Sequence, residues 1–143
     1  MLPQPANTNR RIRILIVEDN PVDLKMIEKS CQRYGLKCDL HHMDDGAELV
    51  RYLQELDADP TIDSPDIALL DVHLPNFDGV ELVDRIKASK RCGHIPVILM
   101  SNTLRPEDRP MVENIASRFF EKSVDYDAFM KIGEIIQDEL TAS

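Results

Sequence analysis

Short apolar runs alternate with longer amphipathic stretches along almost the whole chain. Runs such as "RILIVED" (residues 13–19) and "DIALLD" (residues 66–71) show little polar alternation, which indicates strands buried on both faces of a sheet. Stretches with apolar residues at helical spacing separate these runs. Because strands that alternate with helices form parallel sheets covered on both sides, we expect an α/β protein.

The pattern contains five strands and five helices. Right-handed crossovers favour a doubly wound five-stranded parallel sheet with the strand order 2-1-3-4-5. Pro106 and Pro110 restrict the start of the fourth helix, so we expect Asp108 to cap a short helix over Arg109–Ala116. The strands are expected within residues 13–19, 37–43, 66–71, 96–101 and 117–122, and the helices within residues 21–34, 45–56, 80–90, 109–116 and 126–140.

The length of 143 residues suits one domain with its own hydrophobic core. Residues 1–10 have no periodic pattern and are expected to form a flexible N-terminal arm, so that a single domain covers residues 11–143. The formal net charge of −9 disfavours nucleic acid as a direct partner. No apolar run approaches the length of a membrane span, and the first residues lack a signal-peptide core. We therefore expect a cytoplasmic protein.

Three cysteines, Cys31, Cys38 and Cys92, cannot all pair within one chain, and none belongs to a CxxC motif. We therefore expect reduced, mostly buried thiols. A metal site formed by Cys38, His41 and His42 is disfavoured, because His41 would point away from the strand face that Cys38 and His42 share.

Polar side chains converge at the ends of four of the expected strands. In a doubly wound sheet, the working site lies outside the carboxyl ends of the strands, near the switch between strands one and three. Three acids gathered there repel one another unless a proton is retained or a cation is bound, and an all-oxygen site suits Mg²⁺ or Mn²⁺. Each residue alone could be a cap or a solvated side chain, but together they form a set for phosphoryl transfer. The residues are Glu18, Asp19, Asp71, Ser101 and Lys122.

Four segments around these residues resemble the signature segments of the response-regulator receiver domain of two-component signalling. The segments are "ILIVEDNPVD", "LLDVHLPNFDGVEL", "IPVILMSN" and "FFEKSVDYDAF", and the resemblance covers about residues 11–140. It implies a flavodoxin-like receiver fold and a role for each matching residue. Asp71 would be the phosphoacceptor, Asp19 a direct metal ligand, Glu18 a metal ligand through water, His73 a metal ligand through its backbone carbonyl, Ser101 the switch hydroxyl, Lys122 the phosphate-pairing lysine and Phe119 the switch aromatic residue.

The resemblance implies a single-domain response regulator rather than an enzyme. Such a regulator takes a phosphoryl group from a sensor histidine kinase with Mg²⁺, assists its own phosphorylation and dephosphorylation, and signals through a changed protein–protein surface. Relay to a histidine phosphotransfer protein is a close variant. The long linker before the third strand and the segment "HIPV" resemble stand-alone receivers, among them partners of phytochrome-type kinases.

Two alternatives remain open. One is a receiver-like module that binds partners without phosphorylation. Ser123 stands where the family usually has a proline after a cis bond, so the Lys122–Ser123 bond is either cis with strain or trans in a rebuilt loop. The other is a Mg²⁺-dependent phosphohydrolase, which needs a second acid two residues after its aspartyl nucleophile, where this chain has His73.

Apolar residues near the C-terminus predict a contact surface. The run "SRFFEK" places Phe119 and Phe120 on opposite faces of the sheet, one of them towards the short fourth helix. The last helix carries more apolar residues than a single stripe against the sheet requires. These are Tyr126, Phe129, Met130 and Ile136. We therefore expect a two-fold homodimer through the fourth helix, the fifth strand and the fifth helix.

Overall fold

Five parallel strands form the central sheet of the computed structural model, which describes residues 11–74, 77–102, 106–107 and 109–142. The spatial order is β2-β1-β3-β6-β7, so the predicted order 2-1-3-4-5 is confirmed. A small antiparallel pair, β4 (His73–Leu74) with β5 (Phe77–Asp78), follows β3 and was not expected. The strands of the main sheet are β1 (Ile12–Val17), β2 (Cys38–Met43), β3 (Ile67–Asp71), β6 (Val97–Ser101) and β7 (Arg118–Glu121). The predicted N-terminal arm, residues 1–10, lies outside the described residues.

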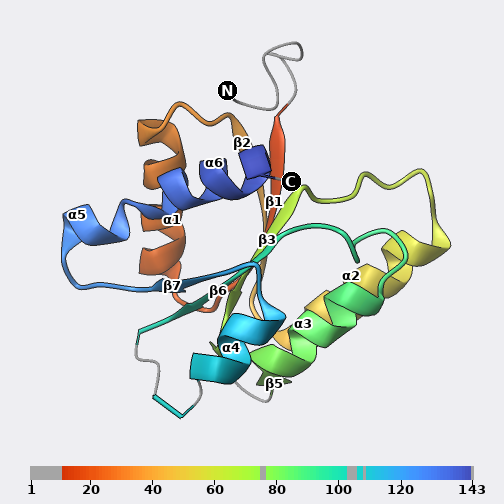
Figure 1. The fold of residues 1–143 in the computed structure, drawn as a ribbon. Coiled ribbons are helices and arrows are strands. Elements are labelled where there is room, and N and C mark those ends of the chain that lie inside the picture. The colour runs from red at the N-terminus through yellow and green to blue at the C-terminus, as the bar shows by residue number, and fades with distance from the viewer. Residues whose placement is uncertain (1–10, 75–76, 103–105, 108, 143) are drawn as a thin grey trace.

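Helices cover both faces of this sheet (Figure 1). One face carries α1 (Pro21–Arg33), α5 (Tyr126–Phe129) and α6 (Ile132–Ala142). The other carries α2 (Gly46–Ala58), α3 (Gly79–Ala88) and α4 (Arg109–Ile115). The fourth helix is as short as predicted, although its expected cap, Asp108, lies outside the described residues. Among the described residues, no helix has the length and apolar character needed to span a lipid bilayer.

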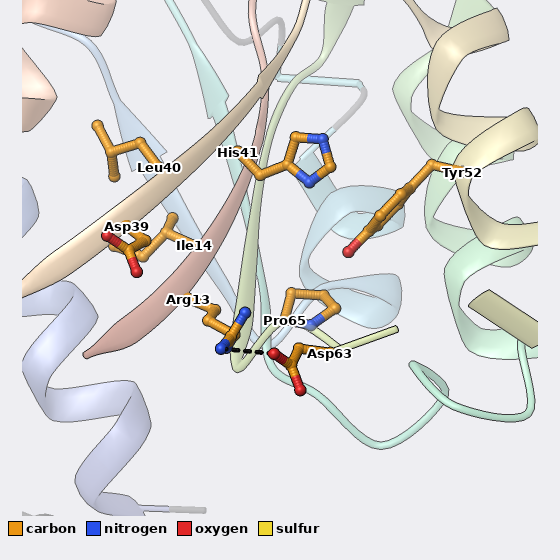
Figure 2. Close-up of a pocket in the computed structure, with 8 residues that line it drawn as sticks. All are labelled: Arg13, Ile14, Asp39, Leu40, His41, Tyr52, Asp63 and Pro65. Carbon is orange, nitrogen blue, oxygen red and sulfur yellow. Dashed lines mark ion pairs between the residues drawn. The ribbon is translucent and has the colours of Figure 1, made fainter. Parts of the chain in front are cut away.

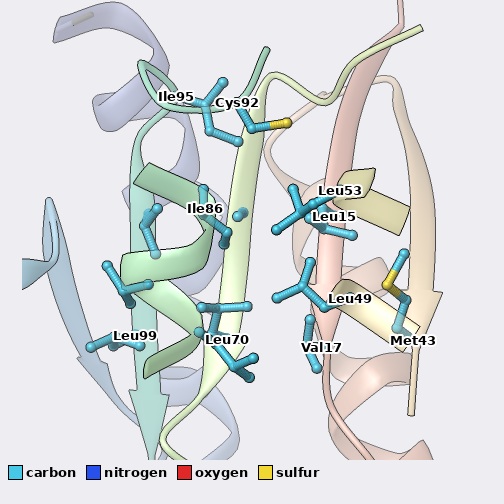
Figure 3. Close-up of a cluster of buried hydrophobic side chains, with 14 of the residues drawn as sticks. Leu15, Val17, Met43, Leu49, Leu53, Leu70, Ile86, Cys92, Ile95 and Leu99 are labelled. Carbon is cyan, nitrogen blue, oxygen red and sulfur yellow. The ribbon is translucent and has the colours of Figure 1, made fainter. Parts of the chain in front are cut away.

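The side chains of the strands alternate between two hydrophobic clusters, one on each face of the sheet. Figure 3 shows part of the first cluster, in which Leu15 and Val17 of β1 and Leu70 of β3 pack with residues of α2 and α3. Ile14 and Ile16 of β1 point into the second cluster, with residues of α1 and α6. Burying one leucine or isoleucine side chain contributes about 1.5–3 kcal/mol. The sheet is thus a rigid layer, and the carboxyl ends of its strands are fixed relative to one another.

The prediction of one continuous helix over residues 126–140 was wrong. The chain forms two helices, α5 and α6, with a break at Met130 and Lys131. The cause is Ser30 of α1, whose buried hydroxyl donates to the backbone carbonyl of Met130 and accepts from the backbone N–H of Gly133 at 2.8 Å. The Met130 carbonyl and the Gly133 N–H thus bond to a side chain of α1 at the point where one helix ends and the next begins.

The expected surplus of exposed apolar side chains on the last helix was also wrong. Phe129 and Met130 are each 2% exposed and Ile136 is fully buried, which leaves Tyr126, at 45% exposed, as the accessible member of the set. Phe129 packs edge-to-face against Phe120, with ring centroids 5.6 Å apart. Phe119 lies on the opposite face, against the cluster that contains Val112 of α4, as predicted.

The long linker before β3 folds back along β1. The backbone of Arg13 exchanges hydrogen bonds with Asp66: its N–H donates to the carboxylate at 2.9 Å, and its carbonyl accepts from the Asp66 N–H at 2.8 Å. The Arg13 guanidinium also pairs with Asp63 at 2.8 Å, beside a small pocket that His41 and Tyr52 border (Figure 2). These contacts fix the amino end of β3, and with it the position at which that strand ends.

Candidate functional site

Three acidic residues lie at the carboxyl ends of β1 and β3. Glu18 and Asp19 follow β1 directly, and Asp71 is the last residue of β3, the neighbouring strand. One carboxylate oxygen from each residue lies within 4.8 Å of the others. Glu18 is fully buried, Asp71 is 8% exposed and Asp19 is exposed, so the cluster opens to solvent on the side of Asp19. The predicted convergence of these three acids is thus present in the fold.

Lys122, the residue that follows β7, joins the cluster. Its side chain is 3% exposed, and its Nζ atom lies 2.5 Å from Glu18 Oε1, 2.9 Å from Asp71 Oδ2 and 2.9 Å from Asp23 Oδ2. The ammonium has three donors, and three carboxylates accept from it. A buried ion network of this kind is stable only when its charges are paired, so Lys122 holds the ends of β1, β3 and α1 together.

Asp23 is a member of the site that the sequence pattern did not indicate. It lies in the first turn of α1, where Asn20 caps the helix by accepting from the N–H groups of Val22 and Asp23, and Pro21 occupies the first position. An acid in a first turn is usually explained by the helix dipole. The cap also directs this acid towards Lys122. The motif "EDNPVD" contains the signal, since its last acid is held in the helical turn that follows the strand end.

Burial and charge set the protonation of the site. Burial raises the pKa of Glu18 to about 7, with Asp71 adding to the increase and Lys122 opposing it. Burial by itself would lower the pKa of Lys122, but its hydrogen bonds to Glu18, Asp23 and Asp71 raise that pKa above its ordinary value. The lysine therefore stays charged, and Glu18 binds a proton more readily than a glutamate in water does.

Ser101 ends β6, the strand beside β3, and is fully buried. It comes one residue after Met100, the register partner of Asp71, and its carbonyl accepts from the N–H of Lys122 at 2.8 Å. The hydroxyl therefore belongs to the same edge of the sheet as Asp71 and Lys122. Phe119 is half-buried in β7, on the face that α4 covers.

Two further predicted positions can be placed by their backbone. His73 begins β4, two residues after Asp71, and pairs with Asp78. The peptide bond between Lys122 and Ser123 is trans, because no cis peptide bond occurs within the described residues. Of the two arrangements considered for this loop, the structure has the one rebuilt in trans.

The histidines of β2 turn to separate partners. The ring of His41 lies edge-on to Tyr52, with centroids 4.6 Å apart. His42 lies 2.7 Å from the backbone carbonyl of Glu18 and 3.1 Å from Asp44. In the part of the chain that the structure describes, the group of side chains suited to a metal ion is Glu18, Asp19 and Asp71.

The donor chemistry of this group fits a hard divalent cation. All three donors are carboxylate oxygens, which Mg²⁺ and Mn²⁺ prefer, whereas zinc favours cysteine and histidine. One of the acids is exposed, so a partly hydrated ion could be bound. A cation would also relieve the mutual repulsion of the carboxylates.

Comparison with known proteins identifies the family. The family model of the response regulator receiver domain matches residues 14–133. The chain is a response-regulator receiver domain. Receiver domains act in two-component signalling with sensor histidine kinases, as regulators rather than enzymes, and the predicted flavodoxin-like receiver fold is confirmed.

Solved structures of similar receivers include regulators associated with phytochromes. The phosphorylated cyanobacterial phytochrome response regulator RcpA superimposes with a TM-score of 0.80 at 25% identity, covering 94% of this chain and 97% of that one. The Mn²⁺-bound form of response regulator Rcp1 has the same fold, with a TM-score of 0.75 at 23% identity over 89% of this chain and 92% of that one. This receiver domain thus resembles stand-alone regulators in its fold.

Among curated relatives, the probable methanogenesis regulatory protein FilR2 of Methanothrix harundinacea is 29% identical over 126 residues, which is 87% of this chain and 81% of that protein. Some other relatives are much longer. The chain spans 10% of the autoinducer 2 sensor kinase/phosphatase LuxQ of Vibrio cholerae, at 33% identity over 71% of this chain. The receiver domain therefore occurs in proteins of very different length.

Proposed function

We propose that this receiver domain accepts a phosphoryl group on Asp71 from the phosphohistidine of a sensor histidine kinase, with Mg²⁺ as the cation. The observation that carries the proposal is the arrangement of Lys122 against Asp71 and Glu18, beside the solvent-facing Asp19. A carboxylate held at a strand end, next to an ammonium and two further acids, has the parts required for acyl phosphate formation.

The chemistry assigns a task to each side chain. An oxygen of Asp71 attacks the phosphorus atom; the new P–O bond forms as the P–N bond breaks, and the imidazole is the leaving group. A bound Mg²⁺ would neutralise charge on the phosphoryl oxygens during the transfer. Glu18 and Asp19 would hold this cation with Asp71, Glu18 through water, and the backbone carbonyl of His73 is the further proposed ligand. Lys122, freed in part from Glu18, pairs with a phosphoryl oxygen.

Phosphorylation would then change the surface around α4, β7, α5 and α6. Ser101 is proposed to move its hydroxyl towards the phosphoryl group, and the half-buried Phe119 to turn further inward. Such a rearrangement alters the affinity for partner proteins. The same set of residues would position water for loss of the phosphoryl group, so that the receiver assists its own dephosphorylation.

The partners of this receiver domain are proposed from chemistry and likeness. The similarity to RcpA supports a phytochrome-type kinase as the donor, and a histidine phosphotransfer protein is a further candidate acceptor. A homodimer through α4, β7 and the final helices remains a prediction, with Tyr126 rather than Phe129 or Met130 available for contact. A cytoplasmic location and a single domain over residues 11–143 likewise remain predictions.

The test is phosphorylation of the purified chain by acetyl phosphate with Mg²⁺. Intact-mass measurement should show one added phosphoryl group that alkali removes, and peptide mapping should place it on Asp71. Asp71→Asn should block the addition, because an amide is not a competent nucleophile. Asp84→Asn, at an exposed acid of α3, is the matched control and should be modified like the parent protein. Modification that persists in Asp71→Asn would refute the assignment.

A further inference from the structure

Two cysteines meet at the end of α1 that is remote from the acidic site. Helix α1 ends in a turn in which Gly35 has a φ of 72°, its N–H donates to the carbonyl of Gln32, and the N–H of Leu36 donates to the carbonyl of Cys31. This is the Schellman pattern, which requires a left-handed residue and suits glycine. It reverses the chain after α1, so that Cys38, the first residue of β2, returns beside Cys31.

The two cysteines pack in the same cluster between α1 and the sheet and differ in exposure. Cys31 is 2% exposed in the cluster between α1 and the sheet, whereas Cys38 is half-buried at the edge strand. Both line one pocket, whose other walls include Arg11, Glu28 and Lys37. A small reagent can therefore reach Cys38 first, with Cys31 directly behind it.

The surroundings favour a thiolate at Cys38. Its pKa lies below the ordinary value, mainly because of the hydrogen bond from Cys31, with the positive charge of Arg11 contributing and burial opposing. The guanidinium of Arg11 is held in place by bonds to the Cys38 carbonyl and to Asp39, each at 2.6 Å. The hydrogen bond to Cys38 and burial both raise the pKa of Cys31, so Cys31 remains the protonated partner.

We propose that Cys31 and Cys38 are a dithiol that hydroperoxides oxidise to an intramolecular disulfide. The Cys38 thiolate attacks one peroxide oxygen; the S–O bond forms as the O–O bond breaks, and the other oxygen leaves as water or an alcohol after taking a proton. The sulfur of Cys31 then attacks Cys38; the S–S bond forms, the S–O bond breaks, and the hydroxyl leaves as water with the thiol proton. Two thiols lose two electrons in total, and the peroxide gains them.

The geometry favours this pair over any other. Both side chains already line one pocket, and a disulfide requires their sulfur atoms to come within the S–S length of about 2 Å. Cys38 lies on β2, an edge strand that is held on one side only, by β1. Cys92 is fully buried in the cluster on the opposite face of the sheet and cannot reach either sulfur. The proposal does not depend on phosphoryl transfer at Asp71.

The test uses the full chain, first reduced and then treated with hydrogen peroxide in small excess. Peptide mapping without reductant should give one linked peptide pair, Cys31 with Cys38, with the intact mass lower by two hydrogen atoms and restored by dithiothreitol. Cys31→Ser should leave a sulfenic acid on Cys38 that dimedone traps. Cys38→Ser should yield neither product. Cys92→Ser is the matched control and should form the bond as the parent protein does.

Three outcomes would overturn the proposal. The first is peroxide treatment that leaves Cys31 and Cys38 unlinked in both the parent protein and Cys92→Ser. The second is a disulfide between two chains, which dilution would prevent. The third is oxidation of Cys92 at the same rate as Cys38. Mapping of the unmutated chain decides the matter even if a serine variant fails to fold, and circular dichroism identifies such a variant.

Discussion

The Nζ atom of Lys122 lies 2.9 Å from Oδ2 of Asp71, although the two residues are 51 positions apart in the chain. The same nitrogen contacts Glu18 and Asp23, so one ammonium neutralises acids from β1, α1 and β3. The lysine therefore has a structural role that does not depend on the proposed phosphoryl transfer. Changes at this residue should affect folding.

Lys122→Ala should destabilise the protein by about 3–5 kcal/mol in the absence of divalent cations, because removing one partner of a buried ion network leaves the other charges uncompensated. Urea unfolding in EDTA measures this loss. Added Mg²⁺ should restore part of the stability, since a cation replaces the missing positive charge. Lys131→Ala, at an exposed lysine, is the control and should change the unfolding free energy little. A loss no larger than that of the control would show that Lys122 is not a structural partner.

Mg²⁺ should raise the melting temperature of the parent protein, because a ligand that binds only the folded state stabilises it. A concentration of about 100 times the Kd adds about 2.7 kcal/mol. Asp19→Ala should remove the increase, since it deletes the solvent-facing ligand and leaves the buried pair intact. Differential scanning calorimetry with and without Mg²⁺ measures the effect, and Asp84→Ala should respond as the parent does. An increase retained in Asp19→Ala would contradict this choice of ligands.

Gly133→Ala should destabilise the packing of α6 on α1. A Cβ atom at this position would lie 2.7 Å from the Ser30 carbonyl oxygen and 2.8 Å from its hydroxyl, so the helices must separate. We expect the free energy of unfolding to fall by about 1–3 kcal/mol. The same change in a helix with open space around the glycine would raise it by about 1 kcal/mol. Chemical denaturation gives the value, with Glu134→Ala on the exposed side of α6 as the reference. A more stable variant would mean that α6 is free to shift.

Asp57 should make stability depend on acid pH. Its carboxylate accepts from the Ser89 hydroxyl at 2.8 Å and from the N–H groups of Arg91 and Lys90, and these bonds, that of Ser89 foremost, lower its pKa from 3.8. A folded-state pKa below the unfolded value contributes stability above the unfolded pKa, and that contribution is lost as pH falls through the folded-state pKa. Asp57→Asn should therefore lower the free energy of unfolding more near neutral pH than at a pH of about 3. Urea titrations at both pH values test this, and equal costs would exclude the linkage.

The strands and their order could be predicted because buried parallel strands have a plain signature of unbroken apolar residues. The convergence of Glu18, Asp19 and Asp71 followed from that order, since the ends of neighbouring parallel strands meet at one edge. Asn20 and Gly35 are local signals, and both bound α1 as their chemistry requires.

Long-range contacts set the limit of that prediction. The break between α5 and α6 depends on Ser30, 100 residues from the carbonyl that accepts its hydroxyl, and no local pattern near Met130 indicates it. Asp23 has the sequence position of an ordinary first-turn acid, and its contact with Lys122 exists only in the folded chain. On one straight helix, the apolar residues of this segment exceed a single stripe and predict an exposed surface, but the helix is broken and Phe129 and Met130 are buried.

Four strand ends contribute side chains to the acidic site, and Lys122, the ammonium that pairs with its acids, follows the strand that is synthesised last. A nascent chain that has emerged only as far as β6 already holds Glu18, Asp71 and Ser101, but it lacks Lys122, which pairs with the acids in the finished fold. Under the proposed chemistry, such a chain could not pair a phosphoryl group at Asp71. Incomplete chains on the ribosome would thus not respond to the kinase. The proposed phosphoryl transfer could begin only when β7 joins the edge of the sheet.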